Sequence, residues 1–425
     1  MMFKKFKERK NGLTTVVSPM PGMTSVSLGI WIGAGGRDED SVQSGISHLI
    51  EHMLFKGTST RSVKDLKRAV EGVGGMFNGF TSDEVTCYMV KVPVKYLELG
   101  MDVLTDMVID PRFDETDLKK EKFVVGEEIK MYRDQPSEHV LELLAELMWP
   151  DHPLGRPLTG NISTVRSMKR QDLIKYKEKF YTPGNISVVA AGNVDPGTVR
   201  QLARERFRHC SRGENVRDRS LRDSPRGPRL RVKHDDIQQT HIALGFRSDI
   251  SDIKERFATK IMNLILGGNM SSRLFEQLRE KHGLCYDISS SYKRHSDVGE
   301  LQVHVGVDTR KTVRAINAVL DEIKKLKDEG VTGEELQRAK RYAEGQFSLA
   351  IENTSARMMW LGDRLMVHNR IPDMKEVIRR LEAVTVTDIR KACERTFTSD
   401  LLNLALIGKV RPSDRKAIKR RLAGI

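Results

Sequence analysis

The segment Thr24–Thr58, TSVSLGIWIGAGGRDEDSVQSGISHLIEHMLFKGT, contains two hydrophobic patterns in succession. In residues 24–35 apolar side chains alternate with small or polar ones, which is typical of a β-strand. In residues 44–55 the apolar side chains recur at helical spacing and fall on one face. They are Ile46, Leu49, Ile50, Met53 and Leu54. A strand followed by an amphipathic helix predicts a domain in which helices pack on a sheet.

A similar order of strands and helices occurs twice in the 425 residues. The matching segments are residues 24–35, 84–93 and 94–109 in the first half, and 239–248, 299–308 and 312–328 in the second. A further helix is expected at residues 253–266. We therefore predict an α+β protein of two homologous halves, each an antiparallel or mixed sheet with helices packed on one face.

A charged stretch near the middle of the chain, His209–Arg231, separates the two halves. It is dense in Arg, Asp, Ser, Gly and Pro and has almost no large apolar side chains, so it cannot contribute much to a core. The sequence predicts an N-terminal domain at residues 1–210, an arginine-rich linker at 211–230 and a C-terminal domain at 231–425.

Composition argues against several classes of protein. The net charge of +14 is concentrated in residues 200–233 and the C-terminal tail, without interleaved aromatic residues, so nucleic acid is not the expected partner. The four cysteines are scattered and form no CxxC pair, which suits a reducing compartment. No run of eighteen apolar residues is present, and we expect no membrane span and a cytoplasmic location.

His48 and His52 stand four residues apart on the predicted helix, with Glu51 directly before the second histidine. Side chains at this spacing point the same way, so the two imidazoles can hold one Zn²⁺ and leave the glutamate for proton transfer. HxxEH is the inverse of the zincin motif HExxH. An exposed polar helix face would give the same five residues, so the motif alone leaves both interpretations open.

A third ligand is required, because a catalytic zinc usually has three protein ligands. Residues 117–134 predict an amphipathic helix in which Glu121 and Glu128 fall on the apolar stripe, whereas Glu127 points away. A carboxylate in such a position is costly unless it meets a cation. A metal ion and a salt bridge to an arginine both satisfy this requirement.

Motifs along nearly the whole chain resemble those of the M16 peptidases, the pitrilysin/insulinase superfamily. They are GAGGRDED, GISHLIEHMLFKGT, GGMFNGFTSDEVTCYMV, EKFVVGEEIKM, FYTPGNISVVAAGNVD, MSSRLFEQLREKHGLCYDISSS and EELQRAKRYAEGQF. Within the superfamily the chain most resembles the mitochondrial processing peptidase and its bacterial relatives. The resemblance implies a clamshell fold and a zinc-dependent metalloendopeptidase.

The resemblance also implies the roles of the acidic residues and histidines. His48, His52 and Glu128 would bind one zinc ion per chain, and Glu121 would support the site from the outer shell and need not touch the metal. Zinc would acidify its bound water and polarise the scissile carbonyl. Glu51 would take the water proton as general base and later deliver it to the leaving amine.

In the second half, the motif LREKHGLCY contains Arg279 and Tyr286, which match an Arg/Tyr pair of the family. By resemblance both reach the zinc site, with Tyr286 near the oxyanion and Arg279 holding the substrate backbone. Without the resemblance, Arg279 would be interpreted as a surface ion pair and Tyr286 as a half-buried strand residue.

The segment Gly74–Glu84 resembles the strand whose edge pairs with the substrate backbone in this family. Asn78 matches a residue that hydrogen-bonds the substrate near the scissile bond, although a turn asparagine is the ordinary interpretation. With its neighbours Phe77 and Gly79 it forms the predicted substrate-binding set.

The implied substrate is an unstructured peptide or presequence-like segment held in a closed chamber. Similar chains form dimers, here a homodimer or a heterodimer with a homologue that has a glycine-rich loop. This chain has only the short LGGNMSS at the position of that loop, so it resembles the catalytic type. Two alternatives remain, a non-catalytic peptide-binding or scaffold subunit of the same fold and a basic protein acting on nucleic acid.

Overall fold

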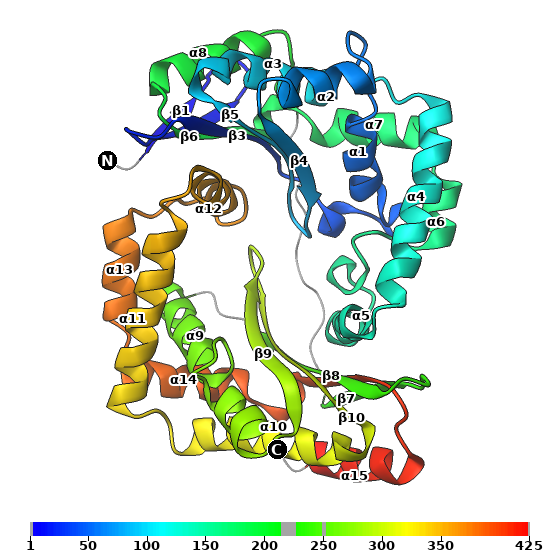
Figure 1. Cartoon of the computed structure of the whole chain (residues 1–425), viewed down its shortest axis with the longest axis vertical. Coiled ribbons are helices and arrows are strands. Elements are labelled where there is room, and N and C mark those ends of the chain that lie inside the picture. The colour runs from blue at the N-terminus through cyan, green and yellow to red at the C-terminus, as the bar shows by residue number, and fades with distance from the viewer. Residues whose placement is uncertain (1–2, 214–226, 249–251, 424–425) are drawn as a thin grey trace. The chain divides into compact units, whose positions relative to one another are not determined.

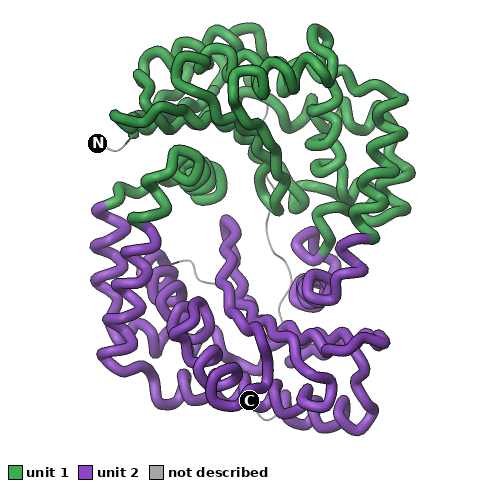
Figure 2. The backbone as a smooth tube through the Cα atoms, in the orientation of Figure 1, with its two compact units in different colours: residues 1–130, 156–219, 348–374 green, residues 131–155, 220–347, 375–425 purple. Residues whose placement is uncertain are grey.

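The computed structural model describes residues 3–213, 227–248 and 252–423 of the chain. The chain forms two compact units, and neither follows one half of the sequence (Figure 2). Unit 1 consists of residues 1–130, 156–219 and 348–374; unit 2 consists of residues 131–155, 220–347 and 375–425. Most of the predicted linker, residues 214–226, lies outside the described residues. The linear boundaries at 210 and 231 stay a prediction.

Unit 1 contains a six-stranded sheet with the strand order β1-β2-β6-β3-β5-β4 (Figure 1). The strands are β1 Lys4–Lys7, β2 Thr14–Pro19, β3 Ser25–Ile32, β4 Met76–Thr81, β5 Thr86–Pro93 and β6 Ile186–Gly192. β2 and β6 are parallel, and the other neighbouring strands are antiparallel. The sheet is therefore mixed, as the sequence predicts.

Most helices of unit 1 share a core with one face of this sheet. The helices wholly or mainly in unit 1 are α1 Ile46–Leu54, α2 Val63–Glu71, α3 Leu97–Ile109, α4 Glu115–Arg133, α6 Ile162–Ser167, α7 Arg170–Phe180, α8 Pro196–Arg206 and α12 Thr354–Met366. Leu28 and Ile30 of β3 face this core. Trp31 faces the other side, where it packs against Met358 and Leu361 of α12. A helix from far along the chain thus covers the face opposite the other helices.

Unit 2 contains a five-stranded sheet with the strand order β7-β11-β8-β10-β9. The strands are β7 Arg229–Lys233, β8 Gln239–Ser248, β9 Cys285–Arg294, β10 Gly299–Asp308 and β11 Leu402–Ile407. β7 and β11 are parallel, and the other neighbouring strands are antiparallel. Both units therefore combine a mixed sheet with packed helices.

The helices wholly or mainly in unit 2 are α5 Pro136–Met148, α9 Ile253–Leu266, α10 Thr312–Asp328, α11 Gly333–Ala350, α13 Met374–Glu382, α14 Val386–Thr396 and α15 Pro412–Leu422. α5 comes close to the sheet at Gly245, where a Cβ atom would lie 2.7 Å from Met148 Sδ. Helices α9 and α10 begin and end at the predicted residues. Among the described residues, no helix combines the length and apolar character needed to cross a membrane.

Candidate metal centre

Helix α1 separates an apolar side from the three polar residues of the HxxEH motif. The five apolar side chains predicted to pack inward are fully buried in the core of unit 1. His48, Glu51 and His52 lie on the other side and are partly buried. Since the apolar side is held by the core, the direction of the polar side is determined as well.

Glu39 caps the N-terminus of α1 from outside the helix. Its two carboxylate oxygens accept the backbone N–H groups of Gly45, at 2.7 Å, and Ser47, at 2.8 Å. Gly45 has a φ of 94°, and a Cβ atom there would lie 2.6 Å from the carbonyl oxygen of Thr159, so glycine is required. Burial raises the pKa of Glu39 to about 7, although both N–H groups lower it. The cap is thus a buried carboxylate at the positive end of a helix.

The structure brings together His48 and His52 of α1 and Glu128 of α4. One ligand atom of each residue lies within 4.8 Å of the other two. Glu128 Oε2 is 3.7 Å from His48 Nε2 and 3.5 Å from His52 Nε2. In the described part of the chain this is the one group of three His, Cys, Asp or Glu side chains arranged to hold a metal ion. Two imidazoles and a carboxylate are a ligand set suited to catalytic zinc.

The two histidines differ in their affinity for protons. Burial and the neighbouring His52 lower the pKa of His48 to about 4, so this ring is neutral at pH 7. Burial also lowers the pKa of His52, but hydrogen bonds to Glu121 and Glu128 outweigh it and raise the pKa to about 9. His48 is therefore ready to bind a metal, whereas His52 must first lose a proton.

Glu121 lies behind His52, on the side away from Glu128. Its Oε2 is 3.1 Å from His52 Nδ1, and its Oε1 accepts a hydrogen bond from Lys56 Nζ at 2.7 Å. Burial would raise the pKa of Glu121, but its bonds to His52 and Lys56 keep the pKa below the usual value. Glu121 thus supports a predicted ligand and is not one of the three clustered residues. Glu127 points away and pairs with Lys130.

Glu51 contacts β4, the edge strand beside α1. Its Oε2 accepts a hydrogen bond from the Thr81 hydroxyl at 2.7 Å. A Cβ atom at Gly79 would lie 3.1 Å from Glu51 Oε1, so the glycine leaves room for the carboxylate. Burial raises the pKa of Glu51, although the Thr81 hydrogen bond lowers it. The sequence does not single out Thr81, although its two-residue spacing from Gly79 on the predicted strand places both residues on one face.

The predicted substrate-binding residues lie on both faces of β4. Phe77 and Gly79 face α1, where the Phe77 ring is 5.4 Å from that of Phe55. Asn78 is exposed, and strand alternation places it on the opposite face. Its Oδ1 accepts the backbone N–H of Gly79 at 2.9 Å. β4 ends the strand order of its sheet, so one of its edges is available for pairing.

Arg279 and Tyr286 lie together in unit 2. Arg279 belongs to a π-helical turn, Phe275–Lys281, and Tyr286 to the start of β9. The guanidinium carbon of Arg279 is 5.0 Å from the centre of the Tyr286 ring. Tyr286 is 81% exposed, so it is not the half-buried strand residue of the alternative interpretation. That these two side chains reach the metal stays a prediction.

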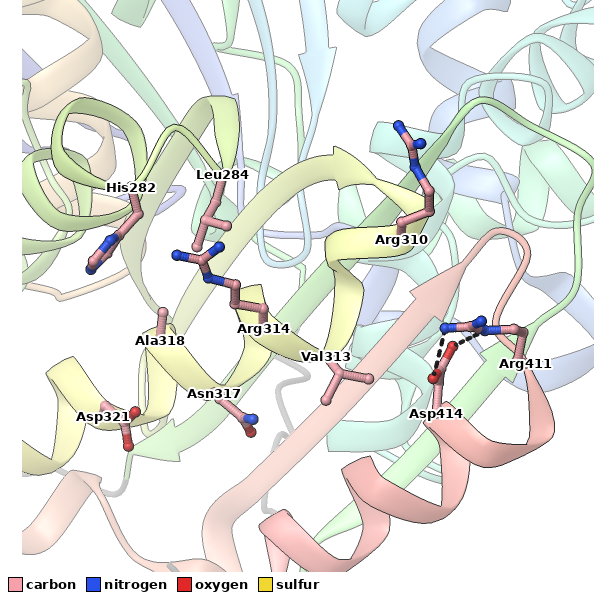
Figure 3. Close-up of a pocket in the computed structure, with 10 residues that line it drawn as sticks. All are labelled: His282, Leu284, Arg310, Val313, Arg314, Asn317, Ala318, Asp321, Arg411 and Asp414. Carbon is pink, nitrogen blue, oxygen red and sulfur yellow. Dashed lines mark hydrogen bonds and ion pairs between the residues drawn. The ribbon is translucent and has the colours of Figure 1, made fainter.

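A separate cavity of about 510 Å³ lies within unit 2 and includes none of the predicted site residues (Figure 3). Three of its lining residues are arginines, Arg310, Arg314 and Arg411. Arg310 pairs with Asp308, and Arg411 pairs with Asp414. Much of the positive charge at this cavity is therefore already balanced.

Comparison with known proteins identifies the family to which the sequence is similar. Residues 15–161 match the family described as insulinase (peptidase family M16), and residues 167–342 match the peptidase M16 inactive domain. An uncharacterized zinc protease of Bacillus subtilis is 33% identical over 398 residues, covering 94% of this chain and 96% of the relative. One of Mycobacterium bovis is 34% identical over 400 residues, covering 93% and 91%.

Solved structures share the fold at lower sequence identity. A protease from Helicobacter pylori superposes with a TM-score of 0.89 at 21% identity, covering 96% of this chain and 99% of that one. A Pseudomonas fluorescens structure described as a peptidase M16 inactive domain also gives 0.89, at 18% identity, covering 97% and 99%. These structures support the fold, whereas the names of the sequence relatives indicate zinc.

Proposed function

Because this chain belongs to the M16 (insulinase) family of peptidases, we propose that it is a zinc-dependent metalloendopeptidase that cleaves unstructured peptides. The observation that carries the proposal is the convergence of His48, His52 and Glu128, with Glu51 on the same side of α1. The donor set fits zinc, since His48 is neutral and the three ligand atoms lie close together.

Each residue of the site then has a distinct task. When bound, zinc supplies a Lewis acid that acidifies a coordinated water and polarises a peptide carbonyl. His48, His52 and Glu128 hold the metal. Glu51 accepts a proton from the attacking water and returns it to the leaving amine. Its raised pKa lies closer to neutral pH, which suits a general base. Thr81 orients the Glu51 carboxylate through its hydrogen bond.

The proposal includes a substrate that adds to the edge of β4 as an extended strand. Phe77, Asn78 and Gly79 would contact it there. Arg279 would hold its backbone, and Tyr286 would donate a hydrogen bond to the oxyanion. The closed chamber and the dimer, with a second copy or a glycine-loop homologue, belong to the same proposal.

The Glu51→Gln variant tests the assignment of the general base. We expect it to retain zinc, since Glu51 is not a ligand, and to lose peptide hydrolysis by about 10²–10⁴-fold. Metal analysis and cleavage of a quenched fluorescent peptide measure the two properties. Glu127→Gln is the matched control, since Glu127 is half exposed and pairs with Lys130.

Two results would contradict the proposal. One is wild-type protein that binds no zinc and cleaves no unstructured peptide. The other is a Glu51→Gln variant that cleaves as fast as the Glu127→Gln control. A non-catalytic scaffold subunit predicts the first result. The inactive-domain match does not favour the scaffold, because residues 167–342 contain none of the proposed ligands.

A further inference from the structure

Lys56 lies two residues after the end of α1 and is linked to the metal site through one carboxylate. Its ammonium group donates to Glu121 Oε1 at 2.7 Å, and Glu121 Oε2 lies 3.1 Å from His52 Nδ1. The other ring nitrogen of His52 faces Glu128 at 3.5 Å. These contacts form a continuous chain from Lys56 to the nitrogen that would bind the metal.

We propose that Lys56 is a positioning residue that sets zinc affinity by holding Glu121 against His52. The inference rests on the zinc site of the proposed function. Lys56 is not one of the three clustered ligands, so it affects the metal site only through its contact with Glu121.

The physical reason lies in the burial of Glu121, which is 5% exposed. A buried carboxylate needs partners for both oxygens, and here one partner is His52 and the other is Lys56. With both bonds made, the carboxylate has one orientation. It then accepts the Nδ1–H of His52, so that the lone pair of Nε2 would be available to a metal once that nitrogen has lost its proton.

The other histidine has no comparable support. His48 Nδ1 is buried and has no hydrogen-bond partner among the described residues. The site is therefore asymmetric, because Nδ1 of His52 has a carboxylate partner in Glu121 whereas Nδ1 of His48 has no hydrogen-bond partner among the described residues. If Glu121 loses its fixed orientation, no comparable interaction at His48 Nδ1 offsets the resulting loss of zinc affinity.

Simple electrostatics predicts that Lys56 has the opposite effect on zinc affinity, so an experiment can distinguish the two explanations. A lysine near a site for Zn²⁺ repels the ion, so its removal should strengthen zinc binding. If Lys56 instead orients Glu121 and His52, its removal should weaken zinc binding. The sign of the change separates the two explanations.

The experiment measures the zinc dissociation constant by competition with a chromophoric chelator. We expect Lys56→Met to weaken zinc binding about tenfold, as outer-shell changes do. Lys56→Arg, which keeps a donor and a charge, should stay close to wild type. Lys67→Met is the control, because it removes the same charge from an exposed position of α2. Lys56 itself is 32% exposed at its side chain, so the variant should fold.

A double-mutant cycle with Glu121→Gln tests whether Lys56 affects zinc binding through Glu121. If Lys56 acts through Glu121, adding Lys56→Met to Glu121→Gln should cause no further loss of affinity. Unchanged or tighter binding by Lys56→Met would overturn the inference, as would equal losses in both backgrounds. Wild-type protein that binds no zinc would instead refute the proposed function.

Discussion

His52 shows how the site depends on single atoms. One ring nitrogen faces Glu121 and the other faces Glu128, so the ring is held between two carboxylates. In the metal-free protein these carboxylates keep the ring protonated, since they raise its pKa to about 9. Zinc must therefore displace a proton from this residue, and we expect its apparent affinity to increase with pH below that value.

At the same scale, Glu39 makes stability depend on pH. Its folded-state pKa of about 7 lies above the ordinary value of 4.5, so the native state holds the proton more tightly. The resulting stabilisation is complete below the unfolded pKa and is lost as pH rises through 7. A shift of this size corresponds to roughly 3 kcal/mol.

The Glu39→Gln variant isolates this contribution. Relative to the variant, wild type should lose up to roughly 3 kcal/mol of unfolding free energy between pH 4.5 and 8. Urea unfolding of the metal-free proteins at several pH values measures the difference. Parallel stability curves for the two proteins would show that Glu39 does not titrate in this range.

At the scale of elements, the site depends on the contact between α1 and β4. Phe77, Gly79 and Thr81 lie on the same face of the strand, as alternate residues do, and this face meets the helix. Glu51 is therefore placed by two elements, the helix that carries it and the strand that limits its position. The periodicity of each element is visible in the sequence, but their contact is not.

Thr81→Val tests that contact with little change in side-chain volume. Loss of the hydroxyl donor to Glu51 should lower kcat by about 10–100-fold, the value of a hydrogen bond to a charged group. Zinc content should not change, because Thr81 is not among the clustered ligands. Thr81→Ser retains the hydroxyl and serves as the control. Equal activity of the valine and serine variants would contradict the role of Thr81.

At the scale of the whole molecule, the proposed chemistry draws on both compact units. The clustered ligands and Glu51 belong to unit 1, whereas Arg279 and Tyr286 belong to unit 2. The units also depart from the order of the chain, since α5 belongs with the second sheet and α12 with the first. Metal binding and transition-state stabilisation should therefore be separable by mutation.

Tyr286→Phe tests this separation. The variant lacks the proposed oxyanion donor, so kcat should fall about 10²–10³-fold while zinc affinity stays at the wild-type value. Because Tyr286 is 81% exposed, stability should change little. Steady-state kinetics with chelator competition measures both properties. Unchanged kcat would remove Tyr286 from the catalytic set.

The sequence by itself determined the local elements and the types of the metal-binding residues. Helical spacing put His48, Glu51 and His52 on one side of α1. Glu121 and Glu128 differed from their neighbours because they are carboxylates on the apolar stripe of α4. The motifs then identified the family and the zinc. These properties are local, because they depend on periodicity and residue type within short segments.

Only the tertiary structure decided which distant groups meet at the site. Glu39, Lys56 and Thr81 are common residue types, and the sequence of their own segments does not reveal which groups they contact. Their roles arise from contacts with Gly45, Glu121 and Glu51, which follow from the packing of loops, helices and the edge strand. The placement of α12 on the first sheet has the same origin, because burial of apolar faces selects partners regardless of their separation along the chain.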